Sequence, residues 1–151
     1  MKVGFRRILF SFFILLSLFL YAENREDELL RNLGKANSKE RILNLCRYQE
    51  TVYYNPINQE GIDKLFAGLY KISENDKEFK EYVDFYNRIK PMFLQEMHKQ
   101  ESVHKRMKLF RNVLDYYQST GDYRFTGICY MHIAYDQYFL GSYESSIENL
   151  M

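Results

Sequence analysis

Apolar side chains recur at helical spacing along most of this sequence, and this periodicity constrains the fold more than any other feature. Two stretches show the spacing of one helix face most clearly: Ile62, Leu65, Phe66 and Leu69, and then Phe79, Tyr82, Val83, Tyr86 and Ile89. With 2 Pro and 7 Gly, the chain has too few turn residues for a sandwich or barrel of many short strands. We therefore predict an all-α fold without strands.

Residues 1–22 are typical of an export signal. Lys2, Arg6 and Arg7 precede an apolar stretch that runs from Ile8 to Ala22. At about 1.5 Å per residue this stretch spans roughly 22 Å as a helix, less than the hydrocarbon layer of about 30 Å. We expect cleavage before Glu23 and a periplasmic location, with an uncleaved membrane anchor as the alternative. Residues 23–151 then form one helical domain.

Turn and capping residues divide residues 23–151 into six to seven helices. Gly34 should end a first helix over 26–33, and Ser38 should cap a second helix that closes at Asn55 and Pro56. Asn58 should cap a third helix that ends near Ser73. The remaining helices are expected before Pro91, up to Gly121, over 124–140, and from Tyr143 onward.

Two similar turns flank the helix expected at 124–140. They are Gly121-Asp122-Tyr123 and Gly141-Ser142-Tyr143, with the glycines 20 positions apart. A glycine ends a helix in the left-handed conformation, and the tyrosine two positions later can pack back as the next helix begins. The repetition predicts an array of helical hairpins.

Through these turns, residues 107–150 resemble tetratricopeptide repeats of the longer variety. In such repeats small residues lie near the middle of each helix, and here those positions hold Ala134 and Ser146. Gln137 departs from the pattern, and the hairpins between Ser38 and Ile89 lack the signature residues. The resemblance implies a right-handed superhelix of antiparallel hairpins. In it, Ala134 and Ser146 let paired helices approach closely.

The resemblance extends to a role. Exported arrays of this kind are similar to the sensor regions of bacterial membrane regulators, which continue into a transmembrane helix and an output module. The helix that begins at Tyr143 has no cap and no partner, so we expect an incomplete array. It should leave Ile133 and Phe139 partly exposed and self-associate. The alternative is a helical accessory region of an enzyme whose catalytic domain lies downstream.

Three residues on the helix expected at 124–140 are the candidates for binding a protein or peptide. Met131, Tyr135 and Tyr138 are spaced i, i+4, i+7, and in a tetratricopeptide-like hairpin this face lines the concave groove. The alternative is that all three belong to the core. Membrane contact is expected only through the N-terminal segment or a downstream helix.

Residues with catalytic chemistry do not form a recognisable motif. His98, Glu101 and His104 are of metal-ligand type, but the two histidines lie about 120° apart around a helix. We therefore predict neither a metal nor a cofactor nor an enzymatic activity, and we expect His132 to be packed and hydrogen-bonded. Cys46 and Cys129 form either a disulfide or two buried thiols.

Charge is distributed unevenly along the chain. Lys and Arg predominate between Arg88 and Arg111, whereas Asp and Glu predominate from Asn112 to Met151. The basic stretch either faces an anionic partner or is an ordinary solvated helix face. Without its signal the chain is slightly acidic, so we expect no nucleic acid to bind it.

Overall fold

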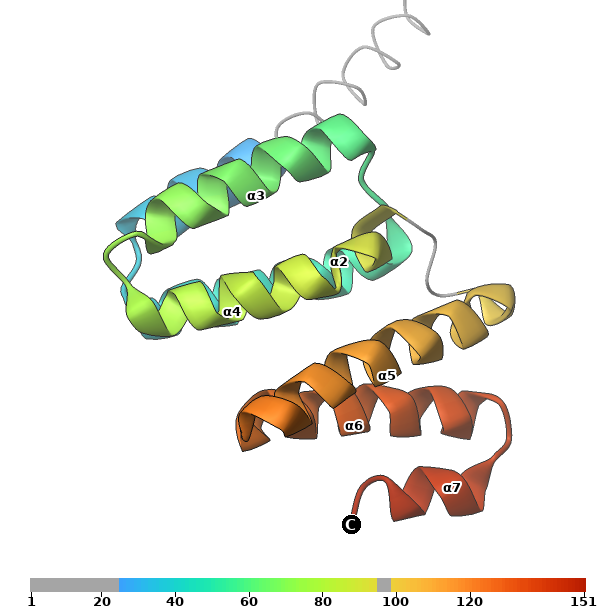
Figure 1. Ribbon diagram of the computed structural model, residues 1–151. Coiled ribbons are helices and arrows are strands. Elements are labelled where there is room, and N and C mark those ends of the chain that lie inside the picture. The colour runs from blue at the N-terminus through green and yellow to red at the C-terminus, as the bar shows by residue number, and fades with distance from the viewer. Residues whose placement is uncertain (1–24, 95–98) are drawn as a thin grey trace, which may run out of the picture.

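The computed structural model describes residues 25–94 and 99–151, and all regular structure in these ranges is helical (Figure 1). A helix over residues 25–35 comes first. It is followed by α2 (Ser38–Tyr54), α3 (Gln59–Ser73), α4 (Lys77–Arg88), α5 (Val103–Thr120), α6 (Tyr123–Phe139) and α7 (Tyr143–Glu148). The all-α prediction is confirmed for these residues. The export signal predicted at 1–22, its cleavage site at Glu23, and His98 lie outside the described ranges.

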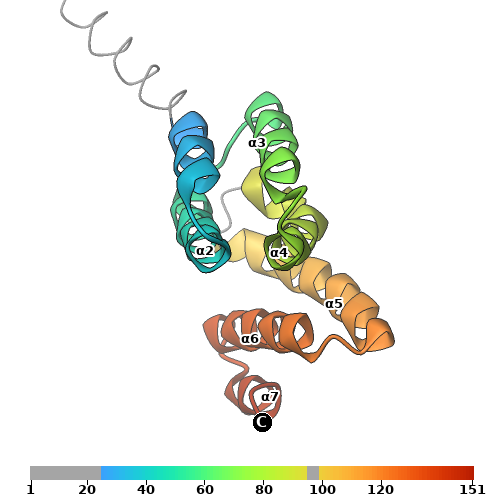
Figure 2. The ribbon, with the colours of Figure 1, turned by 90° about the vertical axis from the view of Figure 1, so that its left-hand side faces the viewer.

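Consecutive helices run in opposite directions and pack in two groups (Figures 1 and 2). In the first group α3 packs against α4, and α4 against α2. In the second group α6 lies between α5 and α7. The chain passes from the first group to the second through two 3₁₀ helices, Lys90–Leu94 and Gln100–Ser102. The first of these contains Pro91, so the predicted interruption of the helix at this proline is confirmed.

Aromatic rings join the two groups. Phe85 of α4 stacks on Phe125 of α6 with ring centroids 4.8 Å apart, and Tyr117 of α5 lies 5.0 Å from Phe125. The Tyr82 ring meets Phe125 edge to face at 5.1 Å. All of these residues except Tyr82 are buried. Tyr82 belongs to the stripe that predicted α4, but Phe85 lies outside that stripe, so α4 contacts the second group partly through a residue that the periodicity did not identify.

Most helix ends are where the capping residues predict them. Asn58 caps α3 by accepting a hydrogen bond from the Gly61 N–H at 2.7 Å. The cap of α2, however, is Asn37 rather than Ser38, because Asn37 and Glu40 form a reciprocal capping box. Gly34 was expected to end the first helix, but the helix continues to residue 35. Gly34 lacks the left-handed conformation that a C-terminal glycine adopts.

The two Gly turns have the predicted backbone. Gly121 and Gly141 have φ values of 72° and 79°, so both are left-handed. The packing predicted for the tyrosines is wrong for Tyr123, which begins α6 on its outer side and is 86% exposed. Tyr143 is also exposed, but its ring does pack back on Tyr138, with the centroids 5.2 Å apart.

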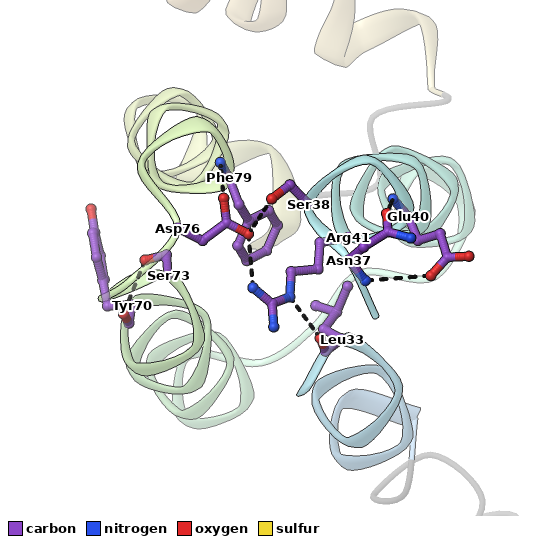
Figure 3. Close-up of polar contacts among 9 residues, drawn as sticks. All are labelled: Leu33, Asn37, Ser38, Glu40, Arg41, Tyr70, Ser73, Asp76 and Phe79. Carbon is purple, nitrogen blue, oxygen red and sulfur yellow. Dashed lines mark hydrogen bonds and ion pairs between the residues drawn. The ribbon is translucent and has the colours of Figure 1, made fainter. Parts of the chain in front are cut away.

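A polar cluster around Asp76 joins three helices (Figure 3). This carboxylate caps α4 by accepting the Phe79 N–H, and it also accepts hydrogen bonds from Ser38 and Arg41 of α2. Arg41 in turn donates to the Leu33 carbonyl at the end of the first helix. Burial alone would raise the pKa of Asp76, but these donors hold it below its usual value. The cluster therefore positions helices and satisfies its own polar groups.

Candidate functional site

The three predicted binding residues lie in one exposed row on α6. Met131, Tyr135 and Tyr138 are 51%, 59% and 61% exposed. Tyr143 of α7 extends this row through its contact with Tyr138. The alternative that the three residues belong to the core is therefore wrong. We call Met131, Tyr135, Tyr138 and Tyr143 the exposed row.

On its other faces α6 packs against α5 and α7. Ser146 of α7 donates a hydrogen bond to the Ala134 carbonyl at 2.8 Å, and both residues are buried. The predicted close approach at these small residues is confirmed. Asn149 donates to the Gln137 side chain at 2.7 Å, so the polar residue that departs from the repeat pattern has a partner on the next helix. These contacts fix the rotation of α6 and thereby present the exposed row.

The prediction of incomplete burial at the end of the array is correct for only one of its two residues. Phe139 is about half exposed, but Ile133 is only 3% exposed. Although α7 has only 6 residues, α7 and α5 together already cover the face of α6 that carries Ile133. At this end of the array the exposed apolar side chains are the exposed row together with Phe139, Ile147, Leu150 and Met151.

A buried ion pair lies behind the exposed row, and sequence reasoning missed it. Nε of Arg106 lies 2.7 Å from Oδ1 of Asp136, and the two residues are 2% and 0% exposed. Burial raises the pKa of Asp136, while Arg106 opposes that rise. The available signal is a lone acidic residue in the last turn of an otherwise mostly apolar helix. Arg106 belongs to the basic stretch between Arg88 and Arg111, which hides its separate role.

His132 is packed, as predicted, and its ring stacks on Phe110 with centroids 4.2 Å apart. The predicted hydrogen bond of His132 is not found among the described residues, and the ring is held by stacking instead. Burial, assisted by the charge of Arg106, lowers the pKa of His132 to about 4. The imidazole is therefore neutral at ordinary pH. It contributes to the packing between α5 and α6.

The other residues considered for chemistry are scattered. Glu101 and His104 are both exposed, and no cluster of three potential metal ligands occurs in residues 25–94 and 99–151. Of the two alternatives for Cys46 and Cys129, a disulfide or two thiols, the structure has the two free thiols. Cys129 is buried, which raises its pKa to about 12, whereas Cys46 is only partly buried.

The basic stretch of the sequence is divided by the fold. Lys105, Lys108 and Arg111 lie on the exposed side of α5, while Arg106 points inward to Asp136. An ordinary solvated helix face accounts for the exposed charges.

Comparisons with family models, with curated proteins and with solved structures gave no match for this chain. Of the helices that the structure describes, none is both long and apolar enough to cross a membrane.

Proposed function

We propose that this chain is an exported helical-repeat module that binds a protein or peptide through the exposed row. The observation that carries the proposal is the exposure of Met131, Tyr135 and Tyr138 on one helix. Tyrosine and methionine are enriched where proteins bind one another, because their side chains offer much contact area. The role is that of a binding module, since no cluster of catalytic type accompanies the row in the described part of the chain.

The finer architecture that we propose is a superhelix of tetratricopeptide type. Its support is the resemblance over residues 107–150, together with the two left-handed glycine turns and the contact of Ser146 with Ala134. In such an array the exposed row would lie on the concave side. We further propose that the module is the periplasmic sensing part of a membrane-spanning regulator, on the basis of the signal-like residues 1–22.

Selection from a displayed library of random peptides tests the binding role. Peptides enriched on the purified chain should lose at least tenfold in affinity when Met131, Tyr135 and Tyr138 are all replaced by Ala. The matched control replaces three exposed apolar residues elsewhere, Leu43, Leu94 and Tyr123, and should retain the affinity. Failure to enrich any peptide, or equal binding by both triple variants, would refute the role of the row.

A further inference from the structure

A cavity of about 590 Å³ lies between α4 and the helices α5 and α6. Its walls carry Tyr70, Asp84, Arg88 and Tyr116, with Glu81 and Asp122 at the same site. The volume is in the range of about 300–1,000 Å³ in which proteins bind small molecules. The exposed row on α6 contributes no residue to it.

Asp84 and Arg88 lie one helical turn apart on α4 and both line this cavity. An acidic residue four positions before an arginine is well placed for an ion pair. Yet neither side chain is within ion-pair distance of an opposite charge in the described part of the chain.

Asp84 and Arg88 instead contact tyrosines of two different helices. The Tyr70 hydroxyl of α3 donates to Oδ1 of Asp84 at 3.0 Å. The guanidinium carbon of Arg88 lies 3.4 Å from the centroid of the Tyr116 ring of α5. A guanidinium stacked on an aromatic face can still direct its edge donors to a planar anion. One of the Arg88 donors also interacts with the Tyr117 hydroxyl, which lies at the same cavity. Asp84 keeps its second oxygen.

The other charges of the cavity are already matched. Glu81 pairs with Arg124 at 2.7 Å. Asp122 caps α6 by accepting hydrogen bonds from the Arg124 and Phe125 N–H groups. The cavity therefore offers one carboxylate and one guanidinium that have no counter-ion among the described residues and that lie beside aromatic rings.

We propose that this cavity binds a small zwitterion, whose ammonium group contacts Asp84 and whose carboxylate contacts Arg88. Free amino acids and short linear peptides share this chemistry. Arginine binds carboxylates through two parallel hydrogen bonds, and the tyrosine rings provide surface for the remainder of the ligand. The site is independent of the proposed function of the exposed row.

Isothermal titration calorimetry on the purified full chain tests the proposal. The probes are the twenty standard amino acids, the dipeptide Gly-Phe and triglycine, together with the N-acetyl and the C-terminal amide forms of each binder. We expect at least one free zwitterion to bind, and each blocked form to bind at least tenfold more weakly. Tighter binding of amino acids than of peptides, or the reverse, then identifies which of the two classes is the ligand. Binding by none of the probes, or equal binding by the blocked forms, would overturn the proposal.

Two variants assign the ends of the ligand. Asp84→Asn should weaken the free zwitterion at least tenfold but leave the N-acetyl form unchanged, because that form has no ammonium group to lose. Arg88→Gln should weaken the free zwitterion similarly and leave the amide unchanged. The matched controls are Glu78→Gln and Lys80→Gln, exposed positions of α4 that do not line the cavity. Circular dichroism confirms folding of each variant. If the cavity variants bind the free zwitterion as the controls do, the assignment is wrong.

Discussion

The hydroxyl of Ser146 donates a hydrogen bond to the backbone carbonyl of Ala134 at 2.8 Å, and neither residue has significant contact with solvent. This contact brings α7 close to α6 at a position where only small side chains fit. A larger residue would have to push the two helices apart.

We expect Ser146→Leu to lower the free energy of unfolding by about 1–3 kcal/mol, as overpacking of an interior does. Ser146→Ala should cost much less, because it removes only the hydrogen bond. Urea denaturation followed by circular dichroism measures both. Glu148→Leu places the same side chain at an exposed position of α7 and serves as the control. A Ser146→Leu variant as stable as this control would contradict the tight packing of α7 on α6.

Breaking the buried ion pair should be costly. Asp136→Ala removes a carboxylate that contacts the buried Arg106 guanidinium, so we expect a loss of about 3–5 kcal/mol. Replacing both residues, as in Arg106→Met with Asp136→Leu, should cost far less than the sum of the two single replacements. The exposed Asp115 of α5, replaced by Ala, is the control and should change stability little. Additive losses in this double-mutant cycle would mean that the two residues are not coupled.

Acid should destabilise the fold through His132. Its pKa is lowered from 6.5 to about 4, so the unfolded chain binds the proton more readily between these values and stability falls as pH decreases from about 6.5 to 4. Between pH 7 and pH 5 this histidine should account for a loss of about 2 kcal/mol. His132→Phe, which can still stack on Phe110, should remove that part of the pH dependence. His104→Gln, at an exposed position, should not. An unchanged pH profile in His132→Phe would contradict the packed, neutral imidazole.

Alanine should have opposite effects at two glycines of the last hairpin. At Gly121, whose φ is 72°, alanine is strained and should cost about 1 kcal/mol. At Gly127, in the interior of α6 and open to solvent, alanine should stabilise the helix by about 0.5–1 kcal/mol. Thermal unfolding of the two variants compares them directly. A gain in stability at Gly121 would show that the turn does not need a left-handed residue.

The export signal can be tested by expression in a Gram-negative host. A C-terminally tagged chain should be recovered from the periplasm with Glu23 as its first residue, because signal peptidase cuts after the small residue that ends the apolar stretch. N-terminal sequencing identifies the cleavage site. Recovery from the membrane of a chain that still begins at Met1 would establish the anchor instead.

The sequence predicts the helices well where their signals are local. Asn58 and Gly121 mark their helix ends because capping depends on a few neighbouring residues. Asn37 and Ser38 are both good caps, and Glu40 decides between them through its bond to the Asn37 N–H. The predicted helix end at Gly34 is wrong, because the backbone at this position does not adopt the left-handed conformation that favours glycine.

The surroundings of a side chain depend on how helices rotate and diverge, which a single sequence does not specify. Periodicity identified the exposed row as one face of α6 but left open whether that face was core or surface. The partner of Asp136 and the cavity beside Arg88 arise only when α4, α5 and α6 are placed together. Their local signals were weak. One was a single acid in an apolar helix, and the other was an acid and an arginine four positions apart.

The ion pair of Arg106 and Asp136 also restricts how α6 can slide along α5. Because α6 is apolar on most sides, hydrophobic contacts alone would accept several alignments of the two helices. Sliding by one turn, about 5.4 Å, would separate the two charges and leave the buried Asp136 carboxylate away from its counter-ion. Only one alignment keeps them together, so this polar contact selects the register in which the hairpin assembles.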